Sequence, residues 1–232
     1  LMRYADLALH RAKQTGRNCL SVFSRALSEE MQRRVLLEAR LKHALERREL
    51  ALHYQPRHEI DSGRLTGWEA LLRWQSPELG NVSPDEFIPL AERSGLILSI
   101  GDWVLHEACR QMRAWQDAGF AAGTMAVNLS ARQLRQMDLA AKVSLVLHDT
   151  GLTPTDLELE VTESSLMDNL ATAATVLGDL ERLGLRIAVD DFGTGYSSLS
   201  YLKTFPIHCL KIDRSFIRDI PDDEDDAAIV RT

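Results

Sequence analysis

Cysteine is scarce in this sequence of 232 residues, and its three cysteines lie far apart. Cys19, Cys109 and Cys209 form no C-x-x-C pair, which argues against a zinc site built from paired cysteines and against a disulfide framework. An odd number of widely spaced thiols is typical of proteins in a reducing compartment. We therefore expect buried thiols and a cytoplasmic location, and this argument leaves open a membrane anchor elsewhere in a longer chain.

Long apolar runs and an excess of positive charge are also missing. The most apolar segment, residues 96–109, is interrupted by Asp102 and His106, so it falls short of the roughly 18 apolar residues that a membrane-spanning helix needs. The net charge of −7 opposes non-specific binding to nucleic acids and to anionic membranes. We expect neither a nucleic-acid polymer nor a membrane as a partner of these residues, and an anionic substrate would need local cations.

Hydrophobic residues make up 45% of the sequence, which is enough for one large domain with a substantial core. Residues 25–50 carry Leu36, Leu37, Leu41 and Ala44 on one helical stripe, so we predict a connector helix that packs against the domain. Residues 18–24 predict a short strand before it. Strand-like segments then follow, separated by helical stretches from the second onward, at 51–60, 65–74, 124–130, 157–163, 185–191 and 208–214.

The order of these segments predicts an α/β fold. DSG at 61–63 joins the first two segments, which predicts an antiparallel hairpin. The later segments predict βα units, and repeated βα units predict a parallel sheet that is either doubly wound or closed into a barrel. No G-x-G-x-x-G follows the first strand, so a doubly wound dinucleotide-binding sheet fits less well.

Polar residues recur on one face of the predicted strands, mostly near the C-terminal ends. The two-residue period of a strand places them together and turns the apolar residues to the opposite face. A (β/α) barrel gathers such residues at one mouth, where the active sites of that architecture lie. The recurring polar positions are Glu69 and Arg73, Asn128 and Ser130, Glu158, Glu160 and Thr162, Asp190, and Lys211 and Asp213.

Two adjacent carboxylates, Asp190 and Asp191, end an apolar run and precede a glycine-rich turn. Adjacent carboxylates repel each other and burial increases the cost, so we expect a positive partner there. Structural salt bridges would suffice, and so would one or two bound metal ions. The sequence has no H-E-x-x-H motif, and oxygen donors suit Mg²⁺ or Mn²⁺ better than zinc.

The polar face is suited to hydrolysis of a phosphodiester by two metal ions. Two ions about 4 Å apart activate a water and stabilise both the attacking and the leaving oxygen. The strand pattern does not choose between Glu158 and Glu160, which share a face. The convergent set is Glu69, Asn128, Glu160, Asp190 and Asp191, together with Lys211.

Six motifs resemble, in order along the chain, those of the EAL domain family of bacterial phosphodiesterases, which cleave cyclic di-GMP to linear pGpG. The resemblance begins near residue 33 and is carried by WEALLRW (68–74), FIPLAERSGLI (87–97), VNLSARQL (127–134), LEVTES (159–164), DDFGTGYSSL (190–199) and LKIDRSFI (210–217). Residues 4–18 resemble the end of a GGDEF diguanylate cyclase domain. We therefore expect a GGDEF remnant at 1–24, a connector helix and the start of the EAL domain at 25–50, and the EAL domain at 51–232.

The resemblance implies an EAL-type (β/α) TIM-like barrel with an antiparallel first strand. We expect it to be C-terminally incomplete here, because the family's last strands carry a further glutamate and a glutamine that this chain lacks. The implied cofactors are two Mg²⁺ or Mn²⁺ ions, with Asp190 bridging both. The implied metal ligands are Glu69, Asn128, Glu160, Asp190 and Asp191.

The resemblance also implies roles for the remaining site residues. Lys211 would lie beside the nucleophilic water and the scissile phosphate, and it joins Glu69 and Asp190 as a candidate catalytic residue. Glu163 is the fourth such candidate, because it would brace the glycine-rich loop at 192–199. The implied substrate contacts are Gln55, Arg73 and Asp213.

The expected partners follow from the same resemblance. The ligand would be cyclic di-GMP, and GGDEF and sensor domains would lie upstream. The glycine-rich loop and the segment SSLSYLKTF (197–205) resemble the family's dimer region, so we expect a homodimer. The main alternative is a catalytically silent EAL receptor that binds cyclic di-GMP, although such receptors usually lose metal carboxylates that this chain keeps.

Overall fold

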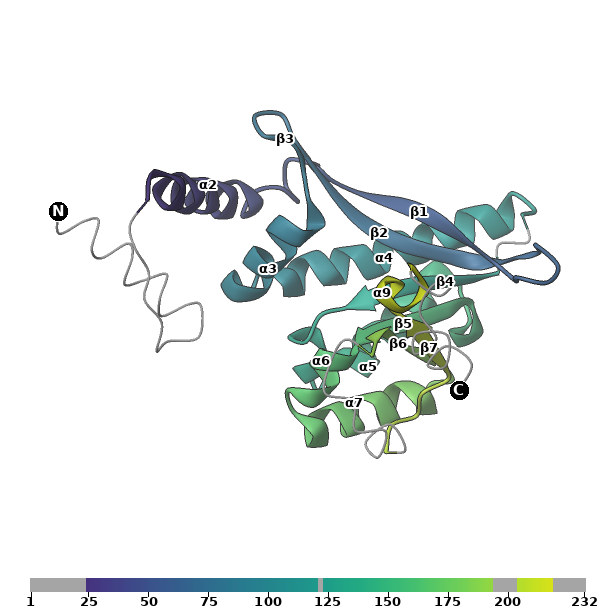
Figure 1. The fold of residues 1–232 in the computed structure, drawn as a ribbon. Coiled ribbons are helices and arrows are strands. Elements are labelled where there is room, and N and C mark those ends of the chain that lie inside the picture. The colour runs from purple at the N-terminus through teal and green to yellow at the C-terminus, as the bar shows by residue number, and fades with distance from the viewer. Residues whose placement is uncertain (1–23, 121–122, 194–203, 219–232) are drawn as a thin grey trace.

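The computed structural model describes residues 24–120, 123–193 and 204–218 (Figure 1). The strands are β1 (Leu50–His58), β2 (Leu65–Ser76), β3 (Gly80–Val82), β4 (Thr124–Leu129), β5 (Leu157–Thr162), β6 (Arg186–Phe192) and β7 (Cys209–Ile212). The helices are α2 (Arg25–Leu41), α3 (Pro84–Ser94), α4 (Leu96–Asp117), α5 (Leu139–Thr150), α6 (Glu163–Met167), α7 (Leu170–Arg182) and α9 (Arg214–Arg218). Two short 3-10 helices, Gln133–Arg135 and Pro154–Asp156, precede α5 and β5.

The strands form one sheet in the order β1-β2-β4-β5-β6-β7, and β3 pairs with β2. β1 is antiparallel to β2, whereas β2, β4, β5, β6 and β7 are mutually parallel. Helix α4 packs on β1, β2 and β4, and α7 packs on β6 (Figure 1). This arrangement confirms the predicted α/β class with an antiparallel first strand.

The register of the strands places the predicted site on one face of this sheet. Gln55 of β1 lies opposite Glu69 of β2, and Asn128 of β4 lies beside Glu160 of β5. Thr162, at the end of β5, lies beside Asp190 of β6. Because side chains of paired positions point to the same side, the polar face predicted from the two-residue period is continuous across the sheet.

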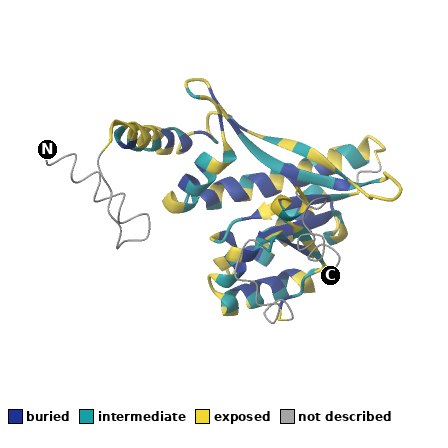
Figure 2. Ribbon diagram, in the orientation of Figure 1, coloured by how far each residue is buried: buried dark blue, intermediate teal, exposed yellow. Residues whose placement is uncertain are grey.

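The apolar face of the sheet forms the core under the helices. Burial concentrates in the parallel strands and on the inward sides of the helices, and the outer sides are exposed (Figure 2). The alternation of buried apolar and polar residues along each strand is what a sheet with one helix-covered face requires. The buried strand residues include Met125, Val127, Leu159, Val161, Ile187 and Val189.

The structure corrects one predicted helix, adds a strand that was not predicted, and leaves several expected segments outside the described residues. The predicted helix at 25–50 was too long, because α2 ends at Leu41 and Arg48 has a φ of 57°, a conformation that no helix continues. Strand β3 was not predicted, because three residues are too few for a periodic pattern. The expected GGDEF remnant, the strand at 18–24 and the C-terminal segment fall almost entirely outside the described residues.

No helix in the described ranges is both long and apolar enough to cross a membrane.

Strands β2 and β4 approach each other more closely at their N-terminal ends than side chains would allow. A Cβ atom on Gly67 would lie 2.3 Å from the carbonyl oxygen of Thr124, and one on Gly123 would lie 2.1 Å from that of Thr66. Gly123 also has a φ of 68°, which favours glycine. These two glycines therefore set the approach of the strands that carry Glu69 and Asn128.

The substitution Gly67→Ala should lower the free energy of unfolding by about 1–3 kcal/mol, because the added methyl group meets the β4 backbone. Urea denaturation measures the change. Gly178→Ala is the matched control, because Gly178 lies in α7 with open space around its Cβ position. There the same substitution should stabilise by about 0.5–1 kcal/mol. Equal effects of the two substitutions would contradict the close approach of β2 and β4.

Candidate metal centre

Three carboxylates from three parallel strands converge on the polar face of the sheet. Glu69 of β2, Glu160 of β5 and Asp190 of β6 each offer an oxygen, and these oxygens all lie within 4.8 Å of one another. Glu160 has no exposed surface, and the other two are partly buried. Three negative charges in this setting need positive partners, because burial removes the water that would otherwise screen them.

Lys211 of β7 lies among these carboxylates. Its ammonium Nζ donates to Glu69 Oε2 at 3.2 Å, to Asp190 Oδ2 at 3.0 Å and to Glu160 Oε2. Burial alone would lower the pKa of Lys211, but the hydrogen bond and charge of Glu160 and the charge of Glu69 raise that pKa above its ordinary value. The lysine is therefore charged at neutral pH and neutralises part of the cluster.

The surroundings of Glu160 perturb its acidity. Burial raises the pKa of Glu160 to about 7, and the charges of Glu69 and Asp190 act in the same direction while Lys211 opposes them. A group poised in this way favours an additional cation nearby, because a further positive charge would stabilise its ionised form.

The two other predicted ligands lie beside this cluster. Asn128 donates from Nδ2 to Glu69 Oε1 at 2.9 Å, and its amide is exposed. Asp191 lies within the irregularity in the β6–β7 pairing and has a φ of 54°, so regular strand alternation does not fix the direction of its side chain. Burial, then the charges of Asp190 and Asp213, raise the pKa of Asp191 above its usual range, which is consistent with its position near the other acids.

The donor set fits a divalent cation. It consists of carboxylate and amide oxygens, which are the ligands that Mg²⁺ and Mn²⁺ prefer. Glu69, Glu160 and Asp190 are close enough to share one ion, and Asp191 supplies a further carboxylate next to Asp190. The structure thus places three of the five predicted ligands, Glu69, Glu160 and Asp190, in a single tight group, and it hydrogen-bonds Asn128 to Glu69. The ligand roles of all five residues stay predictions.

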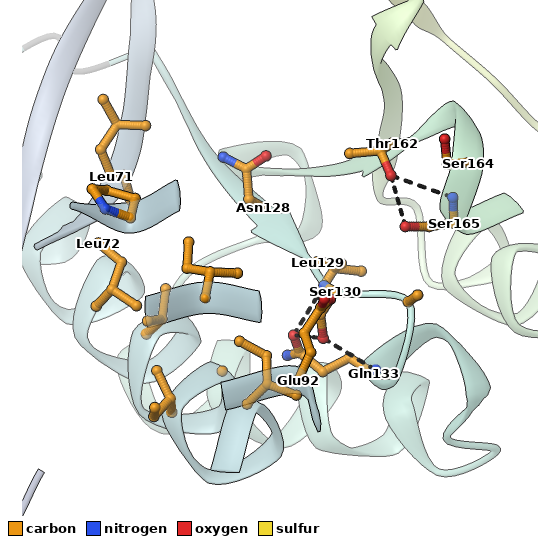
Figure 3. Close-up of a pocket in the computed structure, with 18 of the residues that line it drawn as sticks. Leu71, Leu72, Glu92, Asn128, Leu129, Ser130, Gln133, Thr162, Ser164 and Ser165 are labelled. Atoms are coloured by element: carbon orange, nitrogen blue, oxygen red, sulfur yellow. Dashed lines mark hydrogen bonds between the residues drawn. The ribbon is translucent and has the colours of Figure 1, made fainter. Parts of the chain in front are cut away.

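A cavity of about 520 Å³ reaches Asn128, the hydrogen-bond partner of Glu69, but Glu69, Glu160, Asp190 and Lys211 do not line it (Figure 3). It lies between β2 and β4 on one side and helices α3 and α4 on the other, and Asn128 forms part of its wall. Hydrogen bonds from Ser130 to Gln133 and between Thr162 and Ser165 order its polar side. Its apolar lining comes mainly from Leu72, Ile88, Ile97, Ile100 and Val104.

The three predicted substrate contacts differ in their surroundings. Gln55 is exposed and lies directly across from Glu69, so it borders the cluster. Arg73 lines the cavity and donates from Nη1 to its neighbour's carbonyl, Leu72 O, at 2.8 Å. Asp213 accepts hydrogen bonds from the backbone and hydroxyl of Ser215 at the start of α9. In this structure the Asp213 side chain therefore caps the start of α9.

Glu163 contacts the glycine-rich loop that the family resemblance predicted it would brace. It is almost fully buried at the start of α6, and its Oε2 accepts a hydrogen bond from the backbone N–H of Gly193 at 3.2 Å. Gly193 begins the glycine-rich loop directly after β6. The rest of the loop, residues 194–199, lies outside the described residues, as does most of the predicted dimer segment at 197–205.

Sequence reasoning missed one cation of the site. Arg57 of β1 donates from Nη1 to Glu158 Oε1 at 2.6 Å and to Glu160 Oε1 at 3.2 Å. Glu158 also pairs with Arg186. The available signal was the position of Arg57 two residues after Gln55, which places both on the same face of β1.

The comparisons with known proteins agree with this geometry. Residues 38–232 match the EAL domain family over most of the chain. The chain belongs to the EAL domain family. It is 49% identical over 230 residues to the bifunctional diguanylate cyclase/cyclic di-GMP phosphodiesterase MucR of Pseudomonas aeruginosa, an alignment that covers 99% of this chain and 34% of MucR.

Other relatives and solved structures of the EAL family support the same assignment. Cyclic di-GMP phosphodiesterase PdeR of Escherichia coli is 40% identical over 220 residues, which cover 95% of this chain and 33% of PdeR. The chain thus spans about a third of the length of these curated relatives. The PaMucR phosphodiesterase in complex with c-di-GMP is 51% identical with a TM-score of 0.79, covering 84% of this chain and 79% of that chain. These matches confirm the EAL-type fold.

The substitution Lys211→Met should lower the free energy of unfolding by about 3 kcal/mol in metal-free buffer, because it leaves three partly buried carboxylates without their shared cation. Urea denaturation in EDTA measures the loss, and added Mn²⁺ should reverse much of it. Lys142→Met is the matched control, because Lys142 pairs with two exposed acids, Asp102 at 3.4 Å and Asp138 at 3.9 Å. That change should stay within about 0.5 kcal/mol. A small effect of Lys211→Met, similar to the control, would argue against charge neutralisation by Lys211.

Proposed function

We propose that this EAL protein is a metal-dependent phosphodiesterase that hydrolyses cyclic di-GMP to linear pGpG in bacterial second-messenger signalling. The observation that carries the proposal is the group of Glu69, Glu160 and Asp190 around Lys211, linked through Asn128 to a cavity of about 520 Å³. The identity of 51% to a phosphodiesterase solved in complex with c-di-GMP supports the same substrate.

Five oxygen ligands would hold the metal ions in this proposal. Two divalent ions, Mg²⁺ or Mn²⁺, would supply an activated water and neutralise charge on the phosphate oxygens. Lys211 would place its ammonium beside the phosphate and offset part of the charge of the neighbouring carboxylates. The proposed metal ligands are Glu69, Asn128, Glu160, Asp190 and Asp191.

The cavity and its border would bind the dinucleotide. Its apolar lining offers a surface against which a flat guanine ring can pack, and its polar groups can accept or donate hydrogen bonds to the base edge. Arg73 carries a fork of donors that suits a phosphate, and Gln55 lies across from Glu69. Asp213 is a third proposed contact, which would require its capping hydrogen bonds to rearrange. Glu163 would act as a positioning residue by holding the N–H of Gly193.

The domain organisation and assembly are also proposals. Residues 1–24 would be the end of a GGDEF domain, and residues 25–50 would form a connector helix and the start of the EAL domain. Residues 51–232 would form the EAL domain itself, and sensor domains would lie upstream. The free thiol of Cys109 is buried, which suits the reducing environment of the cytoplasm.

Asp190→Asn and Glu69→Gln should each reduce hydrolysis on the order of 10³-fold or more, because each removes a negative metal ligand while keeping the size of the side chain. Chromatography of pGpG released by the full-length protein with Mn²⁺ measures the loss. The melting temperature should not fall, because Lys211 retains two carboxylate partners in either variant. The surface substitution Asp102→Asn is the control and should leave turnover unchanged.

Two other outcomes would count against the proposal. Retained turnover together with a lower melting temperature would show that the carboxylates are structural ion-pair partners. Tight binding of cyclic di-GMP by the unsubstituted protein, without pGpG release in the presence of Mg²⁺ or Mn²⁺, would favour the catalytically silent receptor.

The homodimer makes a separate prediction. Multi-angle light scattering of the full-length protein at micromolar concentration should give twice the mass of one chain. A monomer with full activity at that concentration would contradict the dimer without affecting the phosphodiesterase proposal.

A further inference from the structure

Arg57 crosses the interior of the curved sheet to reach Glu160. It starts on β1, and two strands, β2 and β4, separate β1 from β5 in the sheet. Its Nη1 nevertheless lies 2.6 Å from Glu158 Oε1 and 3.2 Å from Glu160 Oε1. The guanidinium of Arg57 therefore reaches β5 across the concave side of the sheet, past β2 and β4.

Small residues on the intervening strands leave room for this side chain. Gly67 lies opposite Arg57 on β2 and contributes no side chain to the interior. Ala126 of β4, which pairs with both Glu69 and Glu158, contributes only a methyl group. A larger side chain at Ala126 would compete with the guanidinium for this space.

The two oxygens of Glu160 face different cations. Oε1 accepts from Arg57, and Oε2 accepts from Lys211 on the side of Glu69 and Asp190. Glu160 has no exposed surface, so no water is available to fix its orientation. The hydrogen bond to Arg57 thus leaves Oε2 as the oxygen that faces the other proposed metal ligands.

We propose that Arg57 is a positioning residue of the metal centre, which holds Oε1 of Glu160 so that Oε2 is presented to a divalent ion. The inference rests on the proposed function, because it needs Glu160 to be a metal ligand. Hydrogen-bond partners of ligating carboxylates typically contribute 10- to 100-fold to metal affinity.

Removal of the Arg57 charge changes metal affinity in opposite directions if Arg57 positions Glu160 and if it acts only as a nearby positive charge. Arg57 is a cation close to the site, so its Coulomb repulsion with a metal ion predicts tighter metal binding when the charge is removed. Positioning of Glu160 predicts weaker binding. A purely structural role, in which Arg57 only neutralises Glu158, predicts lost stability without a specific effect on the metal.

The experiment measures the Kd for Mn²⁺ alone by electron paramagnetic resonance, together with the melting temperature, in the full-length protein. Arg57→Met should weaken Mn²⁺ binding about 10- to 100-fold, and Arg57→Lys, which keeps a charged donor, should lose less affinity. The double variant Arg57→Met/Glu158→Met also removes the glutamate that loses its nearer cation in Arg57→Met and keeps only Arg186. It should recover the melting temperature while Mn²⁺ binding stays weak.

Arg186→Met is the matched control. Arg186 Nε lies 3.5 Å from Glu158 Oε2, so this change removes a cation from the same glutamate, and no contact of Arg186 with Glu160 occurs among the described residues. Its Mn²⁺ affinity should stay close to that of the unsubstituted protein. With cyclic di-GMP as substrate, Arg57→Met should have a lower kcat than the unsubstituted protein when Mn²⁺ is limiting. A high Mn²⁺ concentration should restore kcat.

Three results would overturn the inference. Unchanged or tighter Mn²⁺ binding by a folded Arg57→Met or double variant would exclude positioning of Glu160. Loss of folding in every Arg57 variant, with Arg186→Met folded, would assign a structural role instead. Failure of the unsubstituted protein to bind Mn²⁺ would overturn the proposed function as well, so the two failures are distinguishable.

Discussion

The site depends on the balance of charge inside the sheet, where Glu69, Glu160 and Asp190 converge on Lys211. Three carboxylates at this separation would repel one another strongly, because the surrounding strands exclude most of the water. Lys211 offsets part of that repulsion from β7, at one end of the strand order, while Glu69 comes from β2. The charge balance therefore ties together strands that are not neighbours in the sheet.

The backbone is arranged to keep these groups together. Gly67 and Gly123 allow β2 and β4 to approach where a Cβ atom would collide with a carbonyl oxygen. The irregular pairing of β6 with β7, together with the positive φ of Asp191, lets two consecutive acids stay near the site. Both features are local departures from regular strand geometry, and both occur beside residues that carry the proposed chemistry.

Much of the fold could be predicted from the sequence because its strands have strong periodic patterns. The hairpin at DSG, the parallel βα units and the shared face of Glu69, Asn128 and Lys211 follow from local periodicity and turn chemistry. The end of α2 could not be predicted, because the helical stripe continues past Leu41 while the chain must turn at Arg48 to enter β1. The proposed ligand rests on the motifs and the relatives, since the strand pattern indicates only oxygen donors and a cation.

By itself the sequence determined which side chains point into the sheet interior, because the two-residue period of a strand leaves little choice of face. It did not determine how deep each one lies. Glu158 and Glu160 share a face, and only the stagger of β5 against its neighbours brings an oxygen of Glu160 within 4.8 Å of one of Asp190, while Glu158 pairs with Arg57 and Arg186. Arg57 of β1 likewise reaches β5 because the sheet is curved. The curvature accumulates from the twist between many pairs of strands, so no local sequence pattern encodes it.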